Sequence, residues 1–402
     1  MLSLIIVACA ILLALFLAFS KKLSGSSNWR ATVTPLASIM GSGFLVSAPL
    51  LSGRVGNLAI FCMAGLLLIA YGVGGAIRYN IKYFEPRSKT GRGVAQSIAL
   101  LSRIVLVAAY LISVTYYLQL LTAFLLSAAG IGGASFANWI TTALLLIIGG
   151  VGMWRGLGML ERVEKYVIAF NLGAIGSLLI GLLIYNLSLV WAGGWSLPAV
   201  DSTIDLSDIR VLLGLLIVVQ GFETSRYLGS EHPPEQRIST MRSAQLISSV
   251  IYLVFIGLVT VLFQQGLGAD VTAIIIMTTP VAAALPILLS VAAIGSQFSA
   301  AVADNSGAGG LLGELTKGRL KPRYAYLLIL VVTIAITWET NVNGIISYAS
   351  RAFALFYVFQ CVVAMIVAWQ RREDVCRVGK LIQFGFLAFI CLLVFALGLP
   401  AE

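Results

Sequence analysis

Charged residues are scarce in this sequence. Asp, Glu, Lys and Arg make up only 10% of its 402 residues, whereas 59% are hydrophobic. A water-soluble domain carries about 25% charged residues, so this chain has too few polar side chains to cover a water-facing surface. Because a membrane-spanning helix needs about 20 apolar residues, the length allows at most a dozen spans and excludes a large soluble catalytic domain.

Histidine and cysteine are also scarce. The one histidine, His232, lies in a polar stretch, and the five cysteines show no Cys-x-x-Cys spacing. These absences argue against a zinc site, a disulfide framework and a Ser-His-Asp triad. An intramembrane enzyme would need a pair of aspartates, and Asp304 has no second aspartate within a span. We therefore expect no enzyme, no bound metal and no cofactor apart from a coupling ion.

Apolar runs separated by charged residues predict twelve membrane-spanning helices. Their approximate ranges are 2–20, 31–52, 56–77, 94–126, 137–153, 166–190, 208–229, 243–266, 281–305, 324–338, 342–370 and 378–398. Most Lys and Arg residues lie in alternate connections, so the positive-inside rule places both termini outside. The same rule explains the net charge of +10, and we expect a lipid bilayer rather than nucleic acid as the partner. Short loops suit a bacterial inner (plasma) membrane.

The predicted helices divide into two repeats. Residues 31–190 and 208–370 each hold five spans, and because five is odd the second repeat enters the membrane from the opposite face. Residues 1–30 then form a leading helix and inside loop, 191–207 an outside loop, and 371–402 a peripheral helix with an outside C-terminus. The sequence thus predicts an all-α polytopic fold built as a 5+5 inverted repeat. In transporters of this build, the binding site lies where the first helix of each repeat is broken.

Glycine and polar residues interrupt the first helix of both repeats. Unwound backbone within a membrane is tolerable only where it lines a cavity or binds something. A half-helix N-terminus suits a carboxylate and C-terminal carbonyls suit a cation, so a zwitterion or small anion with a monovalent ion fits this pair; glycines that only permit close helix packing are the alternative. The candidate substrate-binding residues are Met40, Gly41, Ser42, Gly43, Phe44, Gln220, Gly221, Phe222, Glu223 and Thr224.

These two segments resemble a known family. The run Gly41-Ser42-Gly43-Phe44 is similar to the Gly-Ser-Gly-Ile motif in the first core helix of the amino acid–polyamine–organocation (APC) superfamily. The run 221–237 is similar to the sixth core helix of that superfamily and its following loop. The resemblance implies the leucine-transporter-type inverted repeat and alternating-access transport of amino acids or related compounds.

Glu223 and three further residues are candidates for ion coupling. A carboxylate at the second break is a candidate proton carrier or a hydrogen-bond anchor for the broken helix. The resemblance implies that hydroxyls of the eighth core helix complete a sodium site, for which Ser296, Ser299 and Asp304 are the candidates here; a solvated carboxylate near the cytoplasmic end is the alternative for Asp304. The span 166–190 lacks the central lysine of some sodium-independent relatives. Coupling to Na⁺ and to H⁺ both remain open.

Two arginines fall within predicted spans. Arg103 and Arg351 each lie about ten residues into a span, roughly 15 Å deep at 1.5 Å per residue. We expect both to face the interior of the helix bundle, with Arg351 closing an outer gate and Arg103 neutralising Asp304. Snorkelling towards the membrane interface is the alternative for either.

These features together predict a secondary active transporter. It moves a small polar solute, above all an amino acid or related compound, by alternating access coupled to H⁺ or Na⁺. One alternative is an inorganic ion or metal cation transporter on the same fold, which Glu223 keeps open although the breaks lack Asp, Asn and His ligands. Another is a non-transporting membrane sensor subunit, against which the lack of a soluble effector domain argues.

Overall fold

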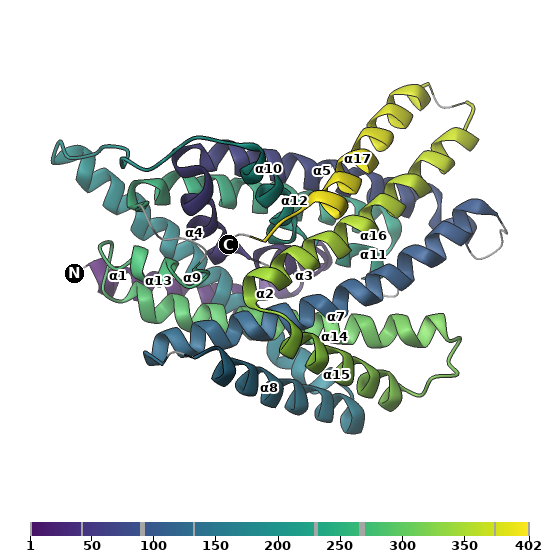
Figure 1. Cartoon of the computed structure of the whole chain (residues 1–402), viewed down its shortest axis with the longest axis horizontal. Helices are drawn as coiled ribbons and strands as arrows, with labels where there is room; N and C mark the ends of the chain where they lie inside the picture. The colour runs from purple at the N-terminus through teal and green to yellow at the C-terminus, as the bar shows by residue number, and fades with distance from the viewer. Residues whose placement is uncertain are drawn as a thin grey trace.

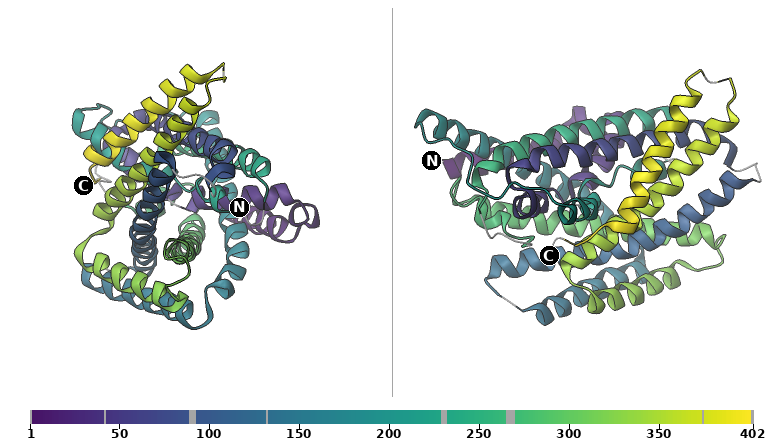
Figure 2. Two further views of the ribbon diagram at one scale, coloured as in Figure 1. Left: turned by 90° about the vertical axis from the view of Figure 1, so that its right-hand side faces the viewer. Right: turned by 45° about the horizontal axis from the view of Figure 1, so that its top comes forward.

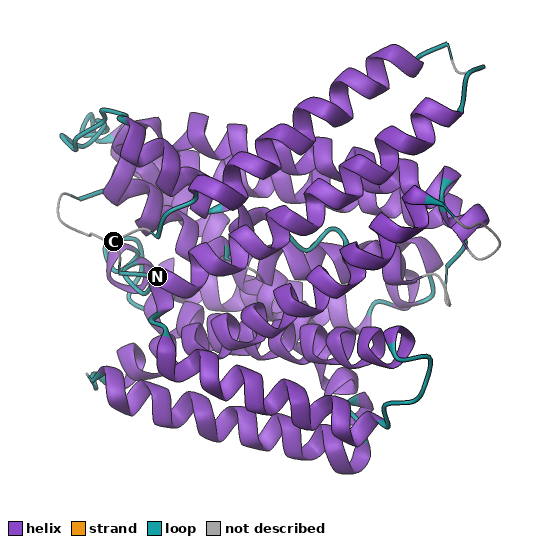
Figure 3. Ribbon diagram, turned by 45° about the vertical axis from the view of Figure 1, so that its right-hand side comes forward, coloured by secondary structure: helices purple, strands orange, loops and turns teal. Residues whose placement is uncertain are grey.

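The protein is almost entirely helical. In the computed structural model, the described residues form helices and loops without a strand (Figure 3). These residues are 2–41, 43–88, 93–131, 133–228, 232–264, 270–373 and 375–400. Ten stretches among them are long and apolar enough to cross a membrane. The predicted all-α polytopic fold is confirmed.

All helices of nine or more residues in the described part of the chain overlap a predicted span. They are α1 (Leu2–Phe19), α3 (Ser27–Gly41), α4 (Phe44–Val55), α5 (Ala59–Tyr83), α7 (Val94–Ala129), α8 (Ala134–Arg155), α9 (Gly158–Trp191), α10 (Leu206–Gly214), α12 (Pro234–Val259), α14 (Leu285–Leu315), α15 (Pro322–Glu339), α16 (Val342–Gln370) and α17 (Arg377–Leu397). Short turns of helix lie between them: α2 (Lys21–Ser24), η1 (Gly56–Leu58), α6 (Glu85–Ser88), η2 (Leu216–Val219), α11 (Thr224–Tyr227), η4 (Thr260–Leu262) and α13 (Ile274–Met277).

The ten apolar stretches and one interrupted segment account for all twelve predicted spans. One stretch covers two predicted spans, and one predicted span is too interrupted to form a long helix. The stretch Ser27–Tyr83 contains both the interrupted pair α3 and α4 and the following helix α5. The segment from α10 through η2 to α11 is interrupted too, and its longest helix has only nine residues. The first helix of each predicted repeat is therefore broken. The exact repeat boundaries, 31–190 and 208–370, stay a prediction.

Apolar side chains cover the outside of the molecule. Leu4 and Leu12 on α1, Phe61 and Leu68 on α5 and Ile287 on α14 are each at least 66% exposed. Exposing such side chains to water is unfavourable, whereas a hydrocarbon environment accommodates them. The surface therefore fits a lipid bilayer, as the composition indicates.

The helices pack in two groups that share α16. In the first group, α12 lies along α3 and α5, and α11 contacts α3 and α12. In the second group, α14 lies along α7 and α9, and α15 packs on α8. Helix α16 lies along α7 and also contacts α5, so it joins the groups (Figures 1 and 2). The leading helix α1 packs on α9, where a Cβ on Gly173 would lie only 2.7 Å from the Ala10 carbonyl oxygen.

Candidate solute site at the paired helix breaks

The first break lies between α3 and α4. The carbonyl of Gly41, the last residue of α3, accepts a hydrogen bond of 3.0 Å from Gln297 Nε2 of α14. At the start of α4, a Cβ on Gly43 would lie 3.1 Å from Val218 Cα, so glycine allows the chain to approach η2 closely. The candidate Ser42 falls outside the described residues.

The second break directly contacts the first. After η2 the backbone of Gln220 is extended, and Gly221 has a φ of +115° that side-chain-bearing L residues rarely adopt. A Cβ on Gly221 would lie 2.6 Å from Ser38 Oγ and 2.7 Å from the backbone nitrogen of Ile39. Glycine is required there both for its backbone conformation and for the contact between the two broken helices.

Tyr252 of α12 ties the two breaks together. Its hydroxyl lies 3.2 Å from the carbonyl oxygen of Ile39 and 2.5 Å from that of Val218, within donating distance of both. These carbonyls belong to α3 and η2, close to where each helix stops. Because the ring is buried, the hydroxyl replaces water as their partner.

Tyr252→Phe is therefore expected to destabilise the folded protein. The substitution leaves buried carbonyls without this donor, which costs about 1–3 kcal/mol, and it loosens the contact between the breaks. We expect a lower midpoint of thermal unfolding in detergent and weaker transport. Tyr348→Phe is the matched control, since Tyr348 is half exposed; equal midpoints for both variants would contradict the role of Tyr252.

Glu223 anchors the second break from within the protein. Its side chain is almost fully buried, and Oε2 accepts hydrogen bonds from the Gly221 N–H (3.0 Å) and the Tyr357 hydroxyl (2.9 Å). Among the described residues, no ion pair to this carboxylate is present. Thr224 Oγ1 donates to the Gly221 carbonyl at 2.7 Å. An acidic group thus lies in the unwound segment with neutral donors only.

The other predicted binding residues lie in the same region. Phe222 stacks on Tyr357 with ring centroids 5.3 Å apart, and Gln220 Nε2 donates to the Tyr117 hydroxyl at 2.9 Å. Phe44 packs against Phe255 and Tyr252 of α12, and Met40 is buried at the end of α3. Side chains from both helix groups therefore surround the breaks.

A small hydroxyl-lined cavity lies beside the breaks. It has a volume of about 40 Å³ and is bounded by α3, α9, α11 and α14, enough for a monovalent ion or a few water molecules. Asn171 Nδ2 donates to Ser296 Oγ at 3.3 Å across it. Its polar lining residues are Thr34, Ser38, Asn171, Thr224, Ser296 and Ser299. Two of the predicted ion-coupling residues, Ser296 and Ser299, thus lie with the second break.

The surroundings of Asp304 correct one interpretation. Its side chain is buried and accepts a hydrogen bond from the Ser113 hydroxyl of α7, so it is not a solvated carboxylate. It does not belong to the lining of the cavity that holds Ser296 and Ser299. The lining of this cavity therefore holds two of the four ion-coupling candidates, Ser296 and Ser299, whereas Glu223 and Asp304 are not part of it.

The arginines within the spans also differ from expectation. Arg103 pairs with Glu314 at 3.9 Å, and both side chains are partly exposed. The expected pair with Asp304 is wrong because the long side chain reaches the more polar end of α14 instead. Arg351 Nε donates to the Phe395 carbonyl of α17 at 2.7 Å. It thus packs on the peripheral helix, and gating by either arginine stays a prediction.

Two contacting broken helices beside a polar cavity define a membrane transporter of the inverted-repeat class. The family model described as APC superfamily transporter matches residues 21–398. An uncharacterized protein of Aquifex aeolicus (strain VF5) is 41% identical over 375 residues, covering 92% of this chain and 91% of the relative. The protein therefore belongs to the APC superfamily of transporters.

Solved structures agree on the fold. A manganese transporter of Eremococcus coleocola, in complex with an aromatic bis-isothiourea substituted compound, superposes with a TM-score of 0.56 at 14% identity, covering 92% of this chain and 88% of that chain. A mutant of that transporter gives a TM-score of 0.59 at 14% identity, with 92% and 87% covered. At this identity the likeness shows the fold alone, which is the leucine-transporter type.

Proposed function

We propose that this protein is a secondary active transporter of an amino acid or a related small zwitterion, working by alternating access coupled to a cation. The observation that carries the proposal is the contact between the two breaks at Gly221 and Ser38. The N-terminus of α4 offers partial positive charge for a solute carboxylate. Glu223, in the unwound segment of the second break, offers a carboxylate partner for an ammonium group.

Proton coupling is favoured over sodium coupling. A sodium ion beside α14 needs the carbonyls at the end of α3, but the Gly41 carbonyl already accepts a hydrogen bond from Gln297. Glu223, by contrast, is a buried carboxylate whose two hydrogen-bond donors are neutral. A proton arriving on this group changes the charge of the unwound segment itself, and we propose Glu223 as its carrier.

A metal cation is the less favoured solute. The E. coleocola neighbours are manganese transporters, and Mn²⁺ prefers carboxylate, carbonyl and water ligands. Among the described residues, no group of three His, Cys, Asp or Glu side chains is close enough to hold a metal ion. We expect proteoliposomes to show no protein-dependent Mn²⁺ uptake; uptake that saturates with Mn²⁺ would reverse this choice of solute.

The orientation of the chain is also proposed. The connections α14–α15 and α16–α17 carry Lys317, Arg319, Arg371 and Arg372, and both lie at the right-hand end of Figure 1. The positive-inside rule assigns that end to the cytoplasm of a bacterial inner membrane, with both termini outside. Helix α11 and the start of α7 lie towards the same end (Figure 1).

Counterflow tests the solute class directly. Proteoliposomes are loaded with an unlabelled amino acid mixture and diluted into radiolabelled pools, without any ion gradient. We expect label to accumulate transiently only in vesicles that contain the protein, and one pool to account for it. A flat response from folded protein would reject amino acids and leave the fold intact, since counterflow needs only solute exchange.

A further inference from the structure

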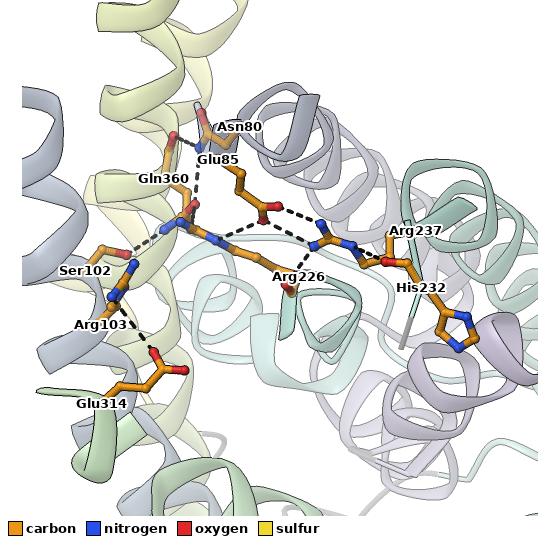
Figure 4. Close-up of polar contacts among 9 residues, drawn as sticks. All are labelled: Asn80, Glu85, Ser102, Arg103, Arg226, His232, Arg237, Glu314 and Gln360. Atoms are coloured by element: carbon orange, nitrogen blue, oxygen red, sulfur yellow. Dashed lines mark hydrogen bonds and ion pairs between the residues drawn. The ribbon is translucent and has the colours of Figure 1, made fainter. Parts of the chain in front are cut away.

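A network of polar side chains lies at the end of the molecule that we assign to the cytoplasm. Figure 4 shows its contacts. It joins residues of α5, α6, α7, α11, α12 and α16. Asn80, Ser102, Arg237 and Gln360 are all buried within it. Buried polar groups of this kind are costly unless each has partners, so their arrangement calls for an explanation that the solute site does not supply.

One half of the network lies within the first helix group. Arg237 of α12 forms two contacts with Glu85 of α6, at 2.6 and 3.2 Å, in the bidentate geometry of a strong pair. The same guanidinium donates to the backbone carbonyl of Arg226 at 2.8 Å and to that of His232 at 3.2 Å. Arg226 Nε also lies 4.0 Å from Glu85 Oε1, so this half fixes α11 to α12 and to α6.

The other half connects α11 to α16 and α7. Gln360 Oε1 accepts hydrogen bonds from the Arg226 guanidinium of α11 and from Asn80 Nδ2 of α5 (3.2 Å). Gln360 Nε2 donates to Ser102 Oγ of α7 at 2.6 Å. One amide side chain therefore contacts three other helices, two from the first group and one from the second (Figure 4).

Arg226 is close in sequence to the solute site. It lies in the same four-residue helix as Thr224, which lines the hydroxyl-rich cavity, and three residues after Glu223. Displacement of α11 therefore alters both the wall of the cavity and the contact with Gln360. A hydrogen bond from a charged donor to an amide is strong enough to shift the equilibrium between two positions of α11. It is also weak enough to break when α11 moves.

We propose that Arg226 and Gln360 form a cytoplasmic latch, which holds α11 against α16 and α7 and closes the hydroxyl-lined cavity to the cytoplasm. The inference rests on the proposed alternating access. When the Arg226–Gln360 contact breaks, α11 keeps its contacts with Glu85 and Arg237 and moves with them away from α16. Gln360 acts through α11 and is a positioning residue of the latch. It is not a ligand of the solute.

A cysteine reporter in the cavity tests the latch without any solute. Ala303 lines the cavity from α14, so Ala303→Cys reports its opening to a membrane-impermeant maleimide added to inside-out vesicles. The chain without this substitution gives the background from native cysteines. Gln360→Ala is expected to raise the rate of reporter labelling about tenfold, as loss of a hydrogen bond to a charged group does.

Gln360→Glu gives the opposite expectation. The carboxylate accepts from Arg226 with full charge, still accepts from Asn80, and accepts a hydrogen bond from the Ser102 hydroxyl, so every partner is kept. Labelling is therefore expected to slow several-fold. Glu314→Gln is the matched control: it removes the nearby Arg103–Glu314 pair, which joins α7 and α14 within the second group (Figure 4), and we expect an unchanged rate.

Two outcomes overturn the latch. One is equal labelling of the parent reporter chain and the Gln360→Ala variant at equal amounts in the membrane. The other is a change of the same sign for Gln360→Ala and Gln360→Glu, which indicates disturbed packing. Shifts of opposite sign support the latch even where amino acid counterflow is flat, so failure of the latch and failure of the solute assignment are read separately.

Discussion

Gly221→Ala is expected to abolish solute transport while leaving the protein in the membrane. The φ of +115° at this residue disfavours any side chain, at roughly 1–3 kcal/mol. A Cβ would also lie 2.6–2.7 Å from atoms of Ser38 and Ile39, two of which belong to the backbone. The breaks must then separate, and we expect counterflow to fall at least about tenfold, with a larger loss for Gly221→Leu.

The control for Gly221→Ala is a glycine whose backbone conformation any residue can adopt. Gly65 lies within helix α5, and a Cβ there would meet no atom within 4 Å. Gly65→Ala is expected to transport normally and to be slightly more stable, since alanine favours a helix over glycine. Normal transport by Gly221→Ala would show that the contact between the breaks is not the solute site.

Glu223→Gln is expected to remove the pH dependence of transport. The amide cannot exchange a proton, yet its carbonyl oxygen is able to accept from the Gly221 N–H or the Tyr357 hydroxyl, so the break stays supported. We expect counterflow to persist at a reduced rate, because the amide oxygen still accepts from an ammonium group but without charge, and to become independent of pH. Accumulation driven by a pH gradient is expected to disappear, because no proton accompanies the solute.

Tyr357→Phe separates the two roles of Glu223. It removes one hydrogen-bond donor but keeps the carboxylate, so we expect weaker transport with its pH dependence retained. If Glu223→Gln keeps the pH profile of the unmodified protein, the proton travels elsewhere. Asp304 or a sodium ion beside Ser296 and Ser299 then becomes the coupling candidate.

The sequence predicts much of this fold because the determining signals are local. Glycine at 41, 43 and 221, within otherwise apolar runs, marks the breaks without any knowledge of tertiary contacts. In the structure, a Cβ would lie 3.1 Å from a neighbouring segment at Gly43 and 2.6 Å from one at Gly221, which explains why glycine occupies both positions. Five spans in each of two halves of nearly equal length, residues 31–190 and 208–370, similarly predict the inverted repeat. The structural neighbours confirm the leucine-transporter-type fold.

Residues whose role depends on distant partners are not predictable in this way. Tyr252 and Tyr357 are ordinary aromatic residues within spans until α12 and α16 bring them to the breaks. Gln297 is an exception, because its place between Ser296 and Phe298 in the polar run of α14 marks it in the sequence as a candidate. The Arg103–Glu314 pair was missed because depth along a single helix does not reveal which residue of a neighbouring helix lies at the same level.

Uptake driven by an imposed pH gradient tests whether the paired breaks carry out proton-coupled transport. Proteoliposomes, acidic outside and free of Na⁺, receive the labelled amino acid pool identified by counterflow, and Gly221→Ala vesicles run in parallel. We expect accumulation above equilibrium that collapses with a protonophore and is absent from the Gly221→Ala vesicles. Accumulation that is equal in both preparations, or that ignores the pH gradient and requires Na⁺, would contradict proton-coupled transport through the paired breaks.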